Sequence, residues 1–183
     1  MKTSAEIASR QAGRELRRTV FSQEEIQARV KVLAREITEA HPPDEELLVL
    51  GLLKGSFIFM ADLVRSIQRP LQLDFLVASS YGNDTVTSGR VRLLYDPEAS
   101  LQGRSVILVE DIVDSGTTLN KLIPLLETRG PRSLEVCALL HKRVGKLDRE
   151  PRWVGFDAPN EFLVGYGLDY GENFRHLPFI GSI

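Results

Sequence analysis

Two spacings of hydrophobic residues alternate in the first third of the chain. Apolar residues recurring at helical spacing predict an amphipathic helix over 23–40; they are Ile26, Val30, Leu33 and Ile37. Ser22 and Glu25 provide a capping box at its start, and the prolines of HPPDEE end it. LLVLGLL (47–53) is instead continuously apolar, which predicts a strand covered on both faces.

The alternation of strand-like and helical segments continues to the end of the chain. After a KGS turn, residues 57–68 have a helical pattern, and so do residues 117–130, which Gly130 closes. Further strand-like segments are 71–80, 91–95, 105–109, 133–140, 153–156 and 161–168. This alternation predicts βαβ units and a mainly parallel sheet. We therefore expect one α/β domain over residues 1–183, with residues 1–20 as a loosely ordered N-terminal arm.

Composition narrows the class of protein. The chain has 183 residues, 43% hydrophobic and 26% charged, with a formal net charge of −2, so no overall field favours nucleic acid or a membrane surface. Its single cysteine, Cys137, excludes an internal disulfide and lies in an apolar run. The N-terminal segment has no apolar core of a signal peptide, and no run reaches the ~20 apolar residues of a membrane span. We expect a cytoplasmic protein that binds neither membranes nor nucleic acid.

The stretch VILVEDIVDSGTT (106–118) holds the most informative polar residues. Three acids, Glu110, Asp111 and Asp114, follow an apolar strand and precede a Ser-Gly-Thr-Thr turn at the start of a helix. Backbone N–H groups and hydroxyls of such a turn suit an anion, and a glycine lets the backbone approach closely. An ordinary helix N-cap is the alternative, but a cap does not require the adjacent acids.

Several common sites lack their sequence pattern. No GxxxxGK(S/T) loop is present, and GYGLDYG is not GxGxxG, which disfavours a P-loop and a dinucleotide fold. The three histidines and one cysteine have no zinc-ligand spacing. The anion site of residues 114–118 therefore needs another explanation.

The same stretch resembles the phosphoribosyl diphosphate (PRPP) motif of the type I phosphoribosyltransferases. LLKGSF (52–57), SSYGND (79–84), LLHKR (139–143), EFLVGYGLDY (161–170) and FRHLPFIG (174–181) follow in the order typical of the bacterial hypoxanthine-guanine, or 6-oxopurine, branch. This resemblance runs from about residue 21 to the C-terminus. It implies a central twisted parallel sheet flanked by helices, a long flexible loop, and a small hood formed by the N-terminal region and about 150–183.

The resemblance also implies a reaction and a division of roles. A 6-oxopurine base and PRPP would give the nucleoside 5′-monophosphate and pyrophosphate with Mg²⁺, in a homodimer or homotetramer. Glu110 and Asp111 would hold the ribose hydroxyls, and Asp114 would be the catalytic residue facing N7 of the purine. The 5′-phosphate would bind to Ser115, Gly116, Thr117 and Thr118.

Other matched positions complete the implied site. The pyrophosphate contacts would be Lys54, Gly55, Ser56 and Arg175, with Leu53–Lys54 as a candidate cis peptide. The purine contacts would be Lys142 to O6, Phe162 by stacking and the Leu163 carbonyl. The Mg²⁺ ligands would be Asp169, Glu110 and Asp111. Ser80 and Tyr81 would open the flexible loop that closes over the reacting centre, consistent with the polar composition of residues 81–104.

Two other functions stay open at the level of sequence. A xanthine-preferring transferase would carry the same motifs, because Lys142 selects a 6-oxo group and not the 2-position. A PRPP-binding regulator of nucleic acid should show an added domain or a concentrated basic face. The short cluster HKRVGK is the main basic run here, and Lys142 already accounts for part of it.

Overall fold

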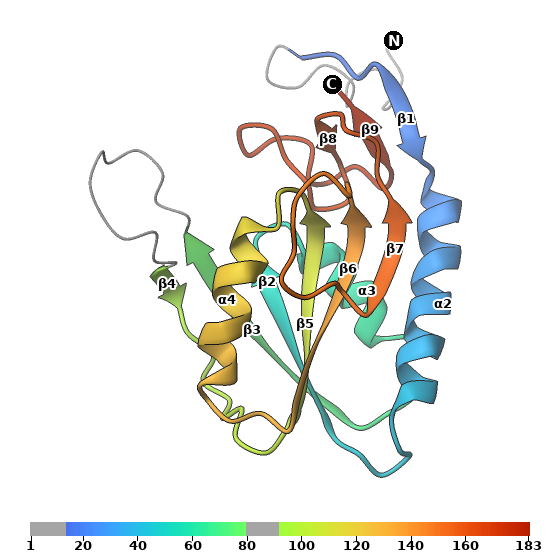
Figure 1. The fold of residues 1–183 in the computed structure, drawn as a ribbon. Helices are drawn as coiled ribbons and strands as arrows, with labels where there is room; N and C mark the ends of the chain where they lie inside the picture. The colour runs from blue at the N-terminus through green and yellow to red at the C-terminus, as the bar shows by residue number, and fades with distance from the viewer. Residues whose placement is uncertain (1–13, 80–91) are drawn as a thin grey trace, which may run out of the picture.

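The computed structural model describes residues 14–79 and 92–183, and its centre is a twisted six-stranded sheet (Figure 1). In spatial order the strands are β4 (Arg92–Tyr95), β3 (Leu71–Ser79), β2 (Leu47–Leu53), β5 (Ser105–Val113), β6 (Ser133–His141) and β7 (Trp153–Asp157). All neighbours pair in parallel except β3 and the edge strand β4. The expected α/β class with a mainly parallel sheet is confirmed.

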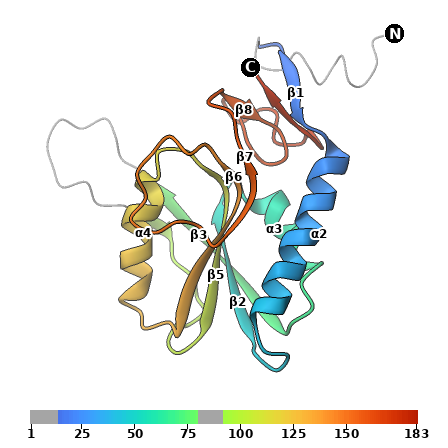
Figure 2. The ribbon, with the colours of Figure 1, turned by 45° about the vertical axis from the view of Figure 1, so that its right-hand side comes forward.

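Helices cover both faces of this sheet (Figures 1 and 2). Helix α4 (Thr117–Glu127) lies on one face, and α2 (Gln23–Ala40) and α3 (Phe57–Val64) lie on the other. Strand β2 serves both layers, because Val49 packs in the core with α2 and α3 whereas Leu48 and Leu50 pack in the core with α4. The predicted burial of this strand on both faces is confirmed.

A second, three-stranded sheet joins the two ends of the chain above the large sheet (Figure 1). It pairs β1 (Arg18–Phe21) with β9 (Ile180–Ser182) and β9 with β8 (Leu163–Val164), both antiparallel. The expectation of a loose arm over residues 1–20 was wrong for β1, whose backbone bonds to β9. Residues 1–13 lie outside the described part of the chain. Strand β7 belongs to the large sheet, so the small sheet begins later than the expected boundary near residue 150.

Most predicted elements are present with shifted ends. The capping box of Ser22 and Glu25 is formed at the start of α2. Helix α3 ends at Val64, before the predicted residue 68, and α4 ends at Glu127, with Gly130 beyond it in a left-handed conformation (φ 68°). The extended segment predicted over 161–168 forms only the short β8, because positive-φ residues from Gly165 onward fold the chain into tight turns.

Strand β5 is longer than the apolar pattern predicted, and this difference matters for the site. The pattern ended the strand at Val109, where the acids begin. The backbone instead stays paired with β6 through Glu110↔Ala138 and Val113↔His141. Glu110 is therefore held by its pairing with β6, whereas the pairing of β5 with β2 ends one residue earlier, at Val109. Both acids thus lie on the part of β5 that extends past its pairing with β2.

Two further expectations concern the flexible loop and membrane-spanning segments. Ser80 and Tyr81, expected to open the flexible loop, lie outside the described residues. Among the residues that the structure describes, no helix has the length and apolar character needed to cross a bilayer.

Candidate active site

The carboxyl end of β5 and the start of α4 enclose a small cavity of about 80 Å³ lined by Glu110 and residues 112–119. Gly116 is the N-cap residue of α4, in a left-handed conformation (φ 78°). The left-handed backbone favours glycine, and a Cβ at this position would also have to displace Leu147 Cδ2, which would lie 2.4 Å away. The N-cap residue itself has no side chain, and the Ser115 hydroxyl accepts only a long hydrogen bond of 3.4 Å from the Thr117 N–H. Among the residues that the structure describes, Asp114 makes no such contact, which argues against the ordinary N-cap alternative for this acid.

The hydroxyl groups of the turn lie beside these backbone amides. Ser115 Oγ and Thr117 Oγ1 are 2.9 Å apart, and both residues are exposed. The positive end of the α4 dipole, the amides and the hydroxyls therefore point to the same small cavity. This arrangement can bind an anion such as phosphate.

Asp114 and Lys142 form an ion pair across the ends of two parallel strands. Lys142 Nζ lies 2.9 Å from Asp114 Oδ2, although the residues are 28 positions apart. Lys142 follows β6, and its backbone N–H donates to the carbonyl of Val113, the last residue of β5. The ammonium is mostly covered, whereas the Asp114 side chain is 56% exposed. A proton acceptor and a donor thus stand side by side next to the phosphate-type turn.

The turn after β2 lies against the acids of β5. The Leu53–Lys54 peptide is cis, as the resemblance indicated. A Cβ on Gly55 would lie 1.7 Å from Asp111 Oδ2, and a Cβ on Gly167 would lie 2.0 Å from the Gly55 carbonyl. Two glycines thus allow the turn after β2, Asp111 and the 165–168 turn to meet at one point.

Ser56 differs from its expected role. Its side chain is fully buried, and its hydroxyl donates to the Leu52 carbonyl at 2.7 Å. The side chain therefore stabilises the turn, and a contact between Ser56 and a diphosphate stays a prediction.

The cations expected to bind pyrophosphate share an acid that the sequence did not reveal. Glu172 Oε1 lies 3.0 Å from Lys54 Nζ, and Glu172 Oε2 lies 3.2 Å from Arg175 Nη2. Hydrogen bonds from Lys54 and Arg175 lower the pKa of Glu172. Arg175 also contacts Asp169 Oδ1 at 2.7 Å and donates to the Gly167 carbonyl. Lys54, Arg175 and Asp169 are thus brought together as expected.

The acids of β5 are held in an unfavourable electrostatic environment. Burial raises the pKa of Glu110 well above its usual range, and the negative charge of Asp111 adds to the effect. Burial also raises the pKa of Asp111 to about 6, although backbone hydrogen bonds and Arg175 act in the opposite direction. Glu110 Oε2 is buried and finds no hydrogen-bond partner among the described residues. Hydroxyl donors or a cation would relieve both acids.

The expected metal ligands Asp169, Glu110 and Asp111 do not form a metal site by themselves. Within residues 14–79 and 92–183, no three His, Cys, Asp or Glu side chains converge as a metal site. Asp169 is close enough to Asp111 for its charge to raise the pKa of that acid. Few carboxylates near an anion site fit Mg²⁺, which usually keeps several waters and binds substrate oxygens.

A pH-dependent stability follows from the raised pKa of Asp111. Such a carboxyl binds its proton more tightly in the folded chain than in the unfolded chain. Its stabilising contribution to the free energy of unfolding is therefore fully present below the usual pKa of 3.8. This contribution is lost as the pH rises through about 6. Asp111→Asn should therefore be more stable than wild type by about 1–3 kcal/mol at about pH 7.5, with little difference near pH 4.

Urea unfolding of both proteins at the two pH values measures this difference. Asp148→Asn, in an exposed loop, controls for the change in charge. An equal stability difference at both pH values would contradict the assigned environment of Asp111.

The expected purine side combines exposed and fixed groups. The Phe162 ring is 53% exposed, and the edge of the Tyr170 ring packs against it at a centroid distance of 5.6 Å. The guanidinium of Arg14 lies 5.2 Å above the Tyr170 ring. Leu163 is buried in β8, opposite Ser182 of β9. Phe162 therefore offers an open aromatic face, and Tyr170 and Arg14 are supports that sequence reasoning missed.

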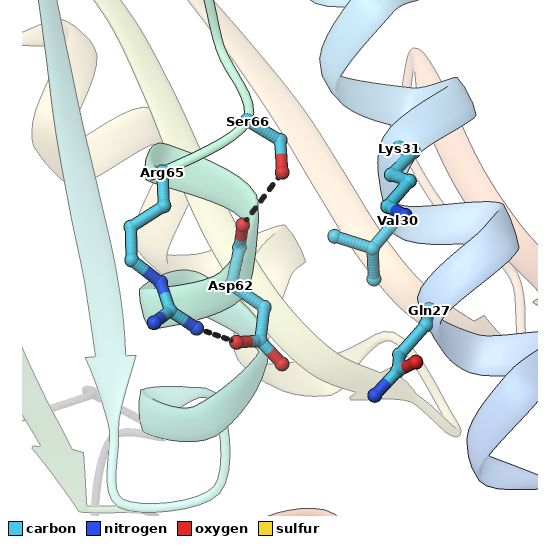
Figure 3. A pocket seen from close by; sticks show the side chains of 6 residues that line it. All are labelled: Gln27, Val30, Lys31, Asp62, Arg65 and Ser66. Carbon is cyan, nitrogen blue, oxygen red and sulfur yellow. Dashed lines mark hydrogen bonds and ion pairs between the residues drawn. The ribbon is translucent and has the colours of Figure 1, made fainter.

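A larger hollow of about 380 Å³ lies elsewhere, between α2 and α3 (Figure 3). Its lining contains none of the expected site residues: Gln27, Val30, Lys31, Asp62, Arg65 and Ser66. Asp62 pairs with Arg65 in this groove and also accepts a hydrogen bond of 2.6 Å from the Tyr166 hydroxyl. The groove therefore helps to hold the 165–168 turn, whereas the acids, cations and glycine contacts place the candidate site at the carboxyl ends of the strands.

Known proteins match nearly the whole chain. Residues 19–171 match the family model of the phosphoribosyl transferase domain. The hypoxanthine-guanine phosphoribosyltransferase of Dictyostelium discoideum is 45% identical over 171 residues, which cover 91% of this chain and 95% of that protein. Its counterpart from Bacillus subtilis is 45% identical over 170 residues, or 92% and 94% of the two chains.

A solved structure agrees with these relatives. The crystal structure of a hypoxanthine-guanine phosphoribosyltransferase from Bacillus anthracis has a TM-score of 0.87 and 46% identity, and the match covers 92% of this chain and 99% of that one. The chain belongs to the phosphoribosyltransferase family and has its type I fold. Within that family it belongs to the hypoxanthine-guanine branch, which confirms the resemblance seen in the sequence motifs.

Proposed function

We propose that this protein transfers the phosphoribosyl group of PRPP to hypoxanthine or guanine, forming IMP or GMP and pyrophosphate in purine salvage. The observation that carries this proposal is the Asp114–Lys142 pair of 2.9 Å beside the phosphate-type turn of α4. It joins a donor and an acceptor for a purine edge to an anion site for the sugar phosphate. The names of the relatives favour this base class over the alternatives.

The substrate sugar phosphate carries different groups along its length. Its 5′-phosphate would bind the amides and hydroxyls of residues 115–118. Its ribose hydroxyls would donate to Glu110 and Asp111, which relieves the buried and unpartnered Glu110 Oε2. Charge that develops on the ribosyl carbon would be stabilised by Asp114.

The base would bind by one polar edge and one aromatic face. In a 6-oxopurine, N7 and O6 lie on the same edge, so Asp114 would accept the proton at N7 while Lys142 donates to O6. An ammonium only donates, and the exocyclic amine of adenine offers no comparable acceptor. The exposed face of Phe162 would stack on the base, and the Leu163 carbonyl would accept from its other edge.

The diphosphate would leave toward the turn after β2. Lys54, Arg175 and the backbone at Gly55 and Ser56 would bind it. Asp169, Glu110 and Asp111 are the residues that would hold Mg²⁺, which when bound neutralises charge on the diphosphate and makes it a better leaving group. The closeness of Asp111, Asp169 and Arg175 supports this assignment.

We also propose a homodimer or homotetramer. Large apolar side chains are exposed along the β3–β4 edge and at the start of α3: Phe57, Leu73, Leu94 and Tyr95. Burial of such exposed apolar side chains would favour contact with a second copy. The cytoplasmic location expected from the sequence stays a prediction.

Steady-state kinetics with PRPP, Mg²⁺ and each of four bases test the function. Hypoxanthine and guanine should give IMP and GMP, and adenine should give no product. A much higher kcat/KM with xanthine would favour the xanthine-preferring alternative. Absence of turnover with every base, together with tight binding of RNA or DNA, would favour the regulator.

Lys142→Ala tests the contact with O6. A hydrogen bond from a charged donor contributes about 1.5–3 kcal/mol, so kcat/KM for hypoxanthine and guanine should fall about 10–100-fold. The KM for PRPP should change little, because Lys142 contacts the base and not the sugar phosphate. Lys146→Ala, in the same loop and exposed, is the matched control. An unchanged kcat/KM with the 6-oxopurines, or a loss confined to PRPP affinity, would count against the O6 contact.

A further inference from the structure

A single carboxylate connects the two cations that are expected to bind the diphosphate. One oxygen of Glu172 contacts Lys54 Nζ at 3.0 Å, and the other contacts Arg175 Nη2 at 3.2 Å. Lys54 lies 118 positions earlier in the chain, so the contact is produced by the fold. A group with two negatively charged oxygens, each on a different cation, has the same pattern of contacts as a phosphate.

The backbone of Glu172 is fixed, but its side chain is not buried. Glu172 has a positive φ of 66°, its N–H donates to Asp169 Oδ2 at 2.8 Å, and Tyr170 and Asn173 exchange backbone hydrogen bonds around it. A positive φ in a residue other than glycine persists only where the surroundings impose it. The carboxylate, in contrast, is 64% exposed, so it can leave the cations without moving the turn.

The cations also differ in how they are held. Arg175 keeps Asp169 Oδ1 at 2.7 Å and the Gly167 carbonyl at 2.7 Å, so it stays oriented when Glu172 leaves. Lys54 is 67% exposed, and its described ion pair is the one with Glu172. Removal of the Glu172 charge should therefore leave Arg175 in place and free the Lys54 ammonium to contact a ligand.

We infer that Glu172 occupies the diphosphate subsite of the ligand-free protein and must release Lys54 and Arg175 when PRPP or pyrophosphate binds. This inference rests on the proposed function, which assigns the two cations to the diphosphate. A competing carboxylate weakens the binding of PRPP and of pyrophosphate. It pairs with Lys54 and Arg175 again when product pyrophosphate dissociates. Glu172 thus sets the affinity of the subsite and favours product release.

Glu172→Gln is the direct test, because glutamine keeps the size of the side chain and removes its charge. An exposed ion pair changes an equilibrium constant by about 1.5–5-fold, so loss of two pairs should tighten pyrophosphate binding about three- to tenfold. Isothermal titration with Mg²⁺ and inorganic pyrophosphate measures this affinity. The gain should shrink between about 50 mM and 300 mM salt, since exposed charges are screened.

Glu150→Gln is the matched control. Glu150 is 61% exposed and pairs with Arg143 at 3.0 Å, so the variant loses the same charge from a similar surface pair away from Lys54. Its affinity for pyrophosphate should equal that of wild type. An equal gain in Glu150→Gln would reduce the effect to net charge and would overturn the inference.

Lys54→Ala separates failure of the inference from failure of the proposed function. If wild type binds pyrophosphate and Lys54→Ala weakens it, but Glu172→Gln has unchanged or weaker affinity, the role of Glu172 is wrong and the assignment of Lys54 holds. If wild type binds no pyrophosphate at all, both the inference and the proposed subsite fail. Tighter binding in Glu172→Gln, with slower dissociation in stopped-flow displacement, supports the inference.

Discussion

Asp114→Asn is expected to lower kcat by about 10²–10⁴-fold, the usual contribution of a general base, while PRPP affinity is retained. The asparagine amide is nearly isosteric but cannot accept the proton of N7 or offset positive charge on the ribosyl carbon. PRPP affinity should survive because the phosphate-binding groups of residues 115–118 do not depend on the Asp114 carboxylate. Single-turnover kinetics at saturating PRPP, with a separate binding titration, distinguish the two effects.

Because Asp114 also pairs with Lys142, the test must include a measurement of base affinity. The variant loses the 2.9 Å contact of wild type, so base affinity must be measured beside turnover. Asp148→Asn, in an exposed loop, is the control and should have wild-type kcat. Turnover of Asp114→Asn at the wild-type level would remove the catalytic role from Asp114.

The large sheet was predictable because its central strands are buried on both faces. Continuous apolar runs therefore mark β2 and β5, and the sheet order places their carboxyl ends side by side. Local chemistry also fixed the start of α2, where Ser22 and Glu25 satisfy each other's backbone amides. The end of β5 was not predictable from hydrophobicity, because the strand continues past its apolar run through the acids Glu110 and Asp111.

The small sheet and Glu172 could not be predicted from local pattern. Strand β1 is short and polar in part, and its pairing with β9 depends on the opposite end of the chain. Glu172 lies in the polar segment GENFR, whose sequence predicts only a solvent-exposed glutamate. Its contact with Lys54 exists only because Gly55 and Gly167 let two distant turns touch.

The motifs indicated the candidate site residues, and the structure adds how closely several of them fit together. Ser56 was expected at the pyrophosphate, yet its hydroxyl is committed to the Leu52 carbonyl. Gly55 was expected there only as part of a turn, yet its α-carbon faces the carboxylate of Asp111. Steric fit between two turns has no signature in residue type alone, because the glycine letter is the same at crowded Gly55 and at Gly171, which has open space around it.

Gly55→Ala is expected to lower kcat/KM for PRPP by about 10²–10³-fold, because the new methyl group displaces the Asp111 carboxylate from the ribose hydroxyls. The added Cβ would lie 1.7 Å from Asp111 Oδ2 and 2.4 Å from Asp111 Cγ. Gly55 has no left-handed backbone angle, so the cost comes from this contact and not from the alanine backbone. The nearest atoms belong to a side chain and not to the backbone, so the free energy of unfolding should fall by only about 1–3 kcal/mol.

A double-mutant cycle with Asp111→Ala decides whether the displaced carboxylate causes the loss. Asp111→Ala removes the three atoms that lie nearest to the new Cβ, which are Oδ2, Cγ and Oδ1 of Asp111. Gly55→Ala should then cause little further loss of kcat/KM in the Asp111→Ala background, whereas independent effects would multiply. Multiplying effects would mean that Gly55 acts on the diphosphate directly, through the approach of its own backbone, and that the fit to Asp111 has no part in PRPP binding.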